Sequence, residues 1–221
     1  METYKLKLHL VSDATFGRGD GVAGLVDVEV EHDGDGLPFL RGRALKGLLA
    51  EESANILFAL ERAQRPCGDW HSAAQKLFGR PGSALDDGAG MHVSDARLPN
   101  DLQVAIRNDI AHKLYTSADV LDSLTTIRRQ TAMDPTGKPE SGSLRAMRVV
   151  VRETPFEAEV RFPAAPDALS LALLAACARA LRRVGAGRNR GRGRVELTLW
   201  DGSGNNVTVT HFRHFQEEVR A

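Results

Sequence analysis

Apolar and polar residues alternate along three segments of the chain, and each alternation predicts a β-strand. Between residues 4 and 10, tyrosine and leucine at even positions alternate with lysine and histidine at odd positions. A period of two is typical of a strand with one buried face. The same period recurs at 156–162 and at 195–199, so a sheet with one buried face is expected.

Two other segments carry apolar residues every three or four positions, which predicts amphipathic helices. The first runs from about 43 to 65 and is stopped by Pro66-Cys67-Gly68. The second covers 171–181, shortly before the last predicted strand. Each helix is expected to pack one apolar face against the sheet.

The middle of the chain, roughly 67–145, is less regular. It is expected to hold a short helix that ends near Phe78-Gly79, then a loop rich in Gly, Asp and Pro, then a strand within 91–94. Asp134-Pro135-Thr136-Gly137 suits the tip of a hairpin or long turn. Regular structure returns with an apolar segment at 144–151, interpreted as another strand.

Taken in order, these elements read β-α-(insertion)-β-β-α-β. That order is the split βαβ, ferredoxin-like arrangement, which RNA-recognition modules use with an open sheet face. We therefore predict an α+β fold with a ferredoxin-like (RRM-like) βαββαβ core. A single domain over 1–221 is expected, with the core at about 1–65 and 144–200 and an irregular insertion at about 66–143. The fold alone does not select a function.

Composition narrows the class of protein. The chain has 221 residues, 42% of them hydrophobic and 26% charged, as in ordinary globular proteins. The amino terminus lacks the apolar region of a signal peptide and no stretch reaches 18 apolar residues, so no membrane segment is expected. The two cysteines, Cys67 and Cys177, are expected to be reduced and unpaired in a cytoplasmic protein.

The formal net charge of zero hides two opposite charge blocks. Residues 19–36 contain six acids and no Lys or Arg, whereas 179–194 contain seven arginines and no acid. Such blocks are often solvated faces. Both are also rich in glycine, which favours a binding role.

The second block contains a Gly/Arg loop at 184–194 that suits a phosphate-rich partner. Glycines permit positive φ and close approach to the backbone, and guanidinium groups bind phosphate oxygens in pairs. A merely flexible, solvated loop and a nucleotide-phosphate site are the alternatives, although the spacing matches neither a Walker loop nor GxGxxG. The candidate RNA-binding residues here are Gly187, Arg188, Arg190, Gly191, Arg192 and Gly193.

A second cationic group opens the first predicted helix. Arg41, Arg43 and Lys46 lie in or just before its first turn, where the helix dipole already attracts anions. Cations there are unfavourable without an anion to meet. The alternative is that these side chains simply point to water.

The acidic block alternates with valines at 26–30 and is either the solvent face of a short strand or a group of acids that act on a phosphodiester. Asp27, Asp33 and Asp35 are therefore candidates for metal-assisted RNA chemistry. His211 and His214 are three residues apart, and a surface pair is favoured over a metal site.

The order of motifs resembles the RAMP superfamily of CRISPR-associated proteins, specifically the guide-RNA-binding backbone subunit of type III effector complexes. The resemblance extends from about 24 to 195, and the combination is more specific than any one motif. It rests on these segments: 24–27, 36–40 with Gly42 and Leu45-Lys46-Gly47, Leu77-Phe78-Gly79, 93–96, Ile127 to Lys138 with Leu144-Arg145 and Phe156, and the Gly/Arg loop.

The resemblance implies a concrete function. Subunits of this kind stack along a guide RNA with other effector subunits, copies or paralogues, each with a protruding hairpin thumb. By motif match, Asp27 falls on the aspartate that cleaves bound target RNA with a divalent metal, Mg²⁺ or Mn²⁺. Arg128 and Arg129 at the hairpin base would meet RNA phosphates.

Two alternatives stay open within the same superfamily. The segment Leu40-Arg41-Gly42-Arg43 departs from the family's Ile-Pro-Gly-Ser, which is compatible with a subunit that binds RNA without cutting it. A guide-processing endoribonuclease is the less favoured alternative. Such enzymes use a histidine near the glycine-rich loop, and none occurs between His112 and His211.

Overall fold

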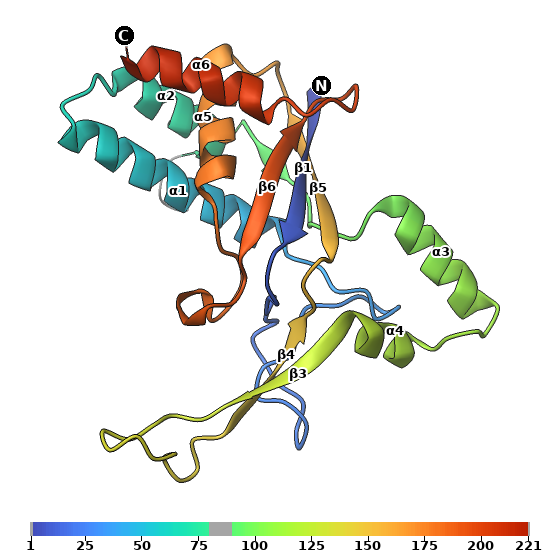
Figure 1. Cartoon of the computed structure of the whole chain (residues 1–221). Helices are drawn as coiled ribbons and strands as arrows, with labels where there is room; N and C mark the ends of the chain where they lie inside the picture. The colour runs from blue at the N-terminus through green and yellow to red at the C-terminus, as the bar shows by residue number, and fades with distance from the viewer. Residues whose placement is uncertain (1, 80–89, 221) are drawn as a thin grey trace.

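The computed structural model describes residues 2–79 and 90–220, so the loop expected after Phe78-Gly79 lies largely outside the described residues. Four strands form an antiparallel sheet in the order β2-β5-β1-β6 (Figure 1). The central strand β1 (Glu2–Leu10) pairs with β5 (Pro155–Phe162) and β6 (Val195–Trp200), and the short β2 (His92–Val93) pairs with β5. The three alternating segments are therefore strands of one sheet, as predicted.

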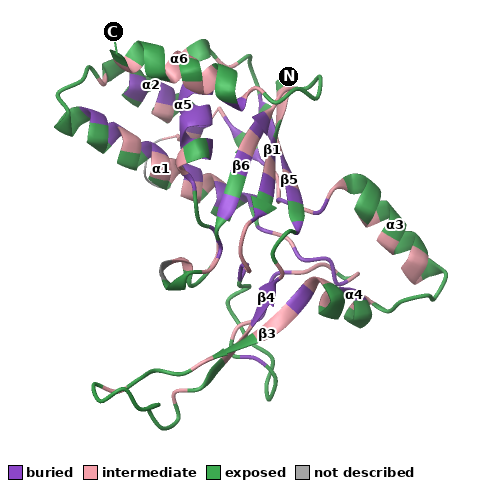
Figure 2. Ribbon diagram, viewed as in Figure 1, coloured by how far each residue is buried: buried purple, intermediate pink, exposed green. Residues whose placement is uncertain are grey.

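Helices cover one face of this sheet and bury its apolar residues. Leu6, Leu8 and Leu10 of β1 are fully or almost fully buried, because their side chains join the core that the helices close (Figure 2). The prediction of a half-buried sheet is confirmed. The covering helices are α1 (Gly42–Arg62), α2 (Gly68–Phe78), α5 (Ala168–Ala180) and α6 (Thr208–Arg220).

The opposite sheet face is polar and carries both charges. Lys5 and Lys7 of β1 form ion pairs with Glu157 of β5, at 3.3 and 3.4 Å. Trp200 of β6 lies under the Lys7 ammonium, 3.9 Å from the ring centroid. RNA-recognition modules stack bases on several aromatic residues of this face. This face instead carries the Glu157 carboxylate and the Trp200 ring, which Lys7 covers, so it does not offer a row of aromatic rings on which bases could stack.

Helix α5 differs from the amphipathic helix that the periodicity predicts. Its residues from Ser170 to Ala178 are all buried, because α5 packs against β6, α1, α2 and α6 together. A helix enclosed by other elements is apolar on every side. None of the described helices has the length and apolar character needed to cross a membrane.

The strand predicted at 144–151 exists but does not belong to the core sheet. β4 (Arg145–Val150) pairs with β3 (Thr125–Gln130) in a separate two-stranded hairpin. Its expected place in the sheet is taken by β2, so the prediction was wrong in its pairing. With the hairpin set aside, the order β1-α1-β2-β5-α5-β6 is consistent with the ferredoxin-like arrangement.

The hairpin protrudes from the body, and its tip forms the predicted turn (Figure 1). The Asp134 carboxylate accepts hydrogen bonds from the amides of Thr136 and Lys138 at 2.8 and 2.9 Å, and Gly137 has a φ of +81°. Before the hairpin, α3 (Asn100–Ala111) and α4 (Ser117–Leu124) form an arm that the sequence analysis did not predict. No residue of α3 is fully buried, and Ile106 and Ile110 are only partly buried against the core.

Candidate nucleic-acid interface

The glycines of the Gly/Arg loop form its turns. Gly187 and Gly191, both in the left-handed region, flank a 3₁₀ turn over Arg188–Arg190. At Gly193, with φ of +71°, an added Cβ would overlap the Val184 carbonyl oxygen. Gly193 is therefore needed so that the two ends of the loop can pack against each other, and not for the approach of a ligand. At Gly191 no atom of the described part of the chain lies within 4 Å of an added Cβ.

Arg192 brings the loop against the base of the hairpin. Its guanidinium contacts the sulfur of Met147 on β4, and its Nε is buried without a hydrogen-bond partner among the described residues. Burial, followed by the positive charges of Arg190 and Arg128, lowers the pKa of Arg192. Arg190 and Arg128 therefore each repel the charge of Arg192, and a bound anion would relieve this repulsion.

Arg128, on β3, is also held by a carboxylate. Its Nε and a terminal nitrogen donate to the same Asp13 oxygen at 3.0 and 2.7 Å. The other Asp13 oxygen accepts from the amide of Arg152 at 3.1 Å. The Asp13 carboxylate therefore fixes the position of Arg128 on β3.

Beside this cluster lies a cleft of about 630 Å³ between the loop and the hairpin. Arg190 from the loop and Arg145 from β4 line it, together with polar hairpin residues. Both arginines are exposed, so their donors face the cleft and solvent. Arg145 was not singled out by the sequence analysis, because only the pairing of β3 with β4 brings it toward the loop.

The cations at the start of α1 have three different environments. Arg41 donates to Glu31, with nitrogen–oxygen distances of 2.6 and 2.8 Å. Arg43 is exposed on the first turn, pointing to water. Lys46 is half-buried and donates to the Met91 carbonyl at 2.8 Å, and burial lowers its pKa. Lys46 therefore ties α1 to the segment that leads into β2.

Arg188 links the Gly/Arg loop to α1. A terminal nitrogen of its guanidinium lies 3.0 Å from a Glu51 carboxylate oxygen. Its backbone carbonyl accepts a hydrogen bond from Arg183. Because Arg188 uses one nitrogen in the Glu51 pair, other donors remain for a ligand.

Asp27 lies where the acidic segment crosses β4. Its amide donates to the Ala146 carbonyl, and one carboxylate oxygen accepts from the Ala146 amide, both at 2.7 Å. The second oxygen is 3.8 Å from Arg145. The side chain is 45% exposed and borders a cleft of about 520 Å³ that Arg129 also lines.

The neighbouring acids are not a solvent face, which corrects one interpretation of the acidic block. Glu29 and Glu31 are 2% and 8% exposed. Glu29 pairs at 3.0 Å with Arg148 of β4, which also donates to Asp122 of α4 at 2.8 Å. These ion pairs bind the acidic segment, the hairpin and α4 to one another.

Asp33 and Asp35 form structural contacts as well. Asp33 accepts from the amides of Asp35 and Leu37 at 3.1 Å and pairs with Arg97 and Arg107 at 3.4 and 3.3 Å. Asp35 pairs with Arg107 of α3 at 3.0 Å. They anchor the α3 arm and do not join Asp27.

The described residues do not assemble a metal site around Asp27. Nowhere within 2–79 and 90–220 do three His, Cys, Asp or Glu side chains converge on one point. His211 and His214 lie on α6, where burial and the charge of His214 lower the pKa of His211. Both cysteines are free, as expected, and burial raises the pKa of the Cys177 thiol.

Comparison with known proteins gives the chain its family. A model of the RAMP superfamily matches residues 7–196. No curated protein matches. The fold is similar to a chain of type III-B Cmr-β bound to cognate target RNA, with a TM-score of 0.61, and to one of its apo state, with 0.59. Each is 15% identical in sequence, over 89% of this chain and 96% of that chain. Because the family model covers most of the chain, including the hairpin and the Gly/Arg loop, this chain belongs to the RAMP superfamily.

Proposed function

We propose that this protein is a cytoplasmic subunit of a type III CRISPR effector complex that binds guide RNA along its backbone. Its superfamily and its fold, similar to that of a Cmr-β chain seen with target RNA, support this proposal. Its partners are the guide RNA, complementary target RNA and other effector subunits, including copies or paralogues of itself.

The convergence of Arg128, Arg190 and Arg192 carries the proposal. The guanidinium of Arg192 contacts Met147, the residue that pairs with Arg128 across the hairpin. Arg190 and Arg128 both act on the charge of Arg192. Guanidinium groups bind phosphate without reading sequence. A surface of this kind suits a guide of any sequence, and the mixed-charge sheet face leaves the hairpin side as the better RNA surface.

A second function, cleavage of bound target RNA at Asp27, is favoured by one observation. The Asp27 carboxylate is half-exposed beside β4, lies 3.8 Å from Arg145, and borders a cleft that Arg129 also lines. Asp27 would be the single carboxylate ligand of a divalent ion there, because the other acids of the block are engaged in structural pairs. The described residues do not by themselves form a metal site. The alternative function is therefore an RNA-binding subunit that does not cut its target.

One experiment tests both functions. The protein is assembled on guide RNA, and labelled complementary target RNA is added with Mg²⁺. Asp27→Asn removes the charge but keeps an oxygen that can accept from the Ala146 amide. Asp20→Asn, in the same acidic block but largely exposed, is the matched control.

Regularly spaced cuts in the wild type and in Asp20→Asn, lost in Asp27→Asn with RNA binding nearly unchanged, are expected if Asp27 acts on the target. Salt-dependent binding with no cuts in any variant would leave a guide-binding subunit alone. A wild-type protein that binds no RNA would overturn the proposed function.

A further inference from the structure

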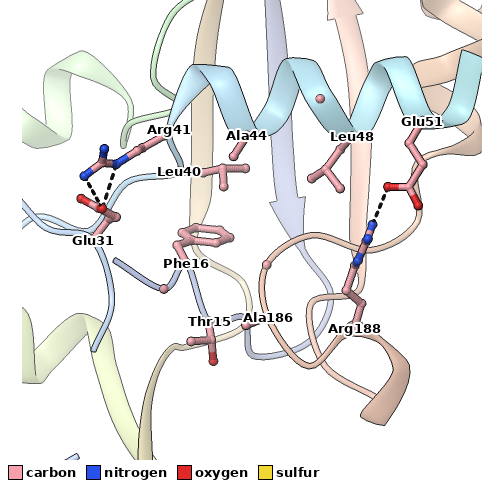
Figure 3. A pocket seen from close by; sticks show the side chains of 13 residues that line it. Thr15, Phe16, Glu31, Leu40, Arg41, Ala44, Leu48, Glu51, Ala186 and Arg188 are labelled. Atoms are coloured by element: carbon pink, nitrogen blue, oxygen red, sulfur yellow. Dashed lines mark hydrogen bonds and ion pairs between the residues drawn. The ribbon is translucent and has the colours of Figure 1, made fainter. Parts of the chain in front are cut away.

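A cavity of about 380 Å³ separates α1 from the Gly/Arg loop, and we call it the α1 slot. Ala44, Gly47 and Leu48 of α1 form one wall, Gly185 and Ala186 form the other, and Phe16 and Leu40 form the floor (Figure 3). Its lining is mostly apolar. The slot lies outside the arginine cluster at the hairpin base.

An ion pair closes each end of the slot (Figure 3). At one end Arg41 meets Glu31, and at the other Arg188 meets Glu51. The Arg41 side chain is 65% exposed and that of Arg188 is 39% exposed, so both guanidinium groups reach solvent. Each guanidinium is shared with a carboxylate, which competes with a phosphate for it, but each keeps nitrogen donors that no carboxylate of the described residues uses. An apolar slot flanked by two such guanidinium groups fits a flat apolar group whose connecting chain is negatively charged on both sides.

Gly47 is a second, independent feature of the slot. It lies inside α1, where glycine is destabilising relative to alanine. No atom of the described residues lies within 4 Å of a Cβ added there. Packing among these residues therefore does not require glycine, whereas a group bound in the slot against α1 would.

We propose that the α1 slot holds one unstacked base of the RNA, with the flanking phosphates on Arg41 and Arg188. This inference rests on the proposed function and adds a base contact to it. The one hydroxyl among the lining side chains, that of Thr15, points away from α1 (Figure 3). The slot therefore takes the π-face of any base and does not read its edge, as sequence-tolerant single-strand sites do.

The test fills the slot with a side chain. Gly47→Leu and Ala44→Leu place a leucine in it, and Ala54→Leu, two turns along α1 from Gly47 and exposed, is the matched control. Each protein is titrated with a short single-stranded RNA and with a ribose-phosphate strand of equal length that carries no bases. Thermal unfolding confirms that each variant folds.

Both slot variants should bind RNA roughly 5- to 150-fold more weakly than the wild type, the range for one lost base-stacking contact. The slope of log affinity against log salt should stay unchanged, because no phosphate contact is lost. The wild type should bind the base-free strand more weakly than it binds RNA. In the slot variants the difference between the two strands should be much smaller. Ala54→Leu should behave as the wild type.

Wild-type affinity in both slot variants would overturn the slot while leaving the proposed function intact. Equal weakening for the strands with and without bases would also overturn it, since the leucine would then obstruct the backbone. If the slot variants bind RNA as the wild type does but no longer assemble with further copies, the slot would hold a segment of a neighbouring subunit and not a base. Failure of the wild type to bind RNA at all would contradict the proposed function itself.

Discussion

The arginines of the candidate interface differ in whether a carboxylate already binds their guanidinium group. Arg41, Arg128 and Arg188 are each paired with a carboxylate. These acids hold the cations in place and compete with a phosphate for them. Arg190 is exposed beside the hairpin cleft, so it is the best-placed donor for an incoming strand.

Arg190→Gln should therefore weaken binding of single-stranded RNA and flatten its salt dependence. The loss of one phosphate contact should reduce the log–log slope by about 0.7. Fluorescence anisotropy titrations across a salt series measure that slope. Arg213→Gln, an exposed arginine on α6, should leave it unchanged, and equal slopes for both variants would remove Arg190 from the interface.

At the scale of elements, α1 and α5 have different tasks. α1 forms one wall of the α1 slot, with Arg41 just before its first turn and Glu51 at the other end of the slot. α5 holds the core together and begins at Asp167, whose carboxylate caps the helix by accepting from the Ser170 amide at 2.8 Å. The same carboxylate pairs with Lys76 of α2 at 2.6 Å.

The Asp167 cap makes stability depend on acid pH. The hydrogen bond from Lys76, then that from Ser170, lowers the pKa of Asp167 to about 2. A carboxyl whose pKa is lower in the folded state stabilises the fold above its unfolded pKa, and loses this effect as pH falls through the folded value.

The stabilisation should therefore be complete above pH of about 4 and disappear toward pH of about 2. Asp167→Asn keeps a capping acceptor but cannot form the ion pair. The difference in melting temperature between wild type and this variant should shrink across that window. A difference that stays constant with pH would show that the Asp167 charge does not contribute.

At the scale of the whole molecule, long-range ion pairs join the protruding parts to the body. Arg148 is 7% exposed and connects Glu29 of the acidic segment with Asp122 of α4. Asp33 and Asp35 attach the α3 arm. The hairpin and the arm, which bury few residues of their own, depend on these pairs for their placement.

Breaking the buried pair at one partner should be costly. Glu29→Leu alone leaves the buried Arg148 without its buried carboxylate partner and should lower the free energy of unfolding by about 3–5 kcal/mol. The double variant Glu29→Leu with Arg148→Met should recover much of this loss, because no buried charge stays unpaired. Urea unfolding of the wild type, each single variant and the double variant measures these free energies. If the losses of the two single variants simply add in the double variant, Glu29 and Arg148 do not stabilise each other.

The sequence by itself determined the strands of the sheet, the first two helices, the hairpin turn and the positions of the cations. These features follow from local periodicity and turn chemistry, which neighbouring residues encode. Only the tertiary structure decided that β4 pairs with β3 and that α6 encloses α5. It also decided that Glu29 and Glu31 are buried, that Asp27 binds Ala146, and that a slot opens beside Gly47. The physical reason is distance along the chain: Glu29 and Arg148 are 119 positions apart, Asp13 and Arg128 115, and Glu51 and Arg188 137. Which residues meet over such separations depends on how the elements pack, and no local pattern records it.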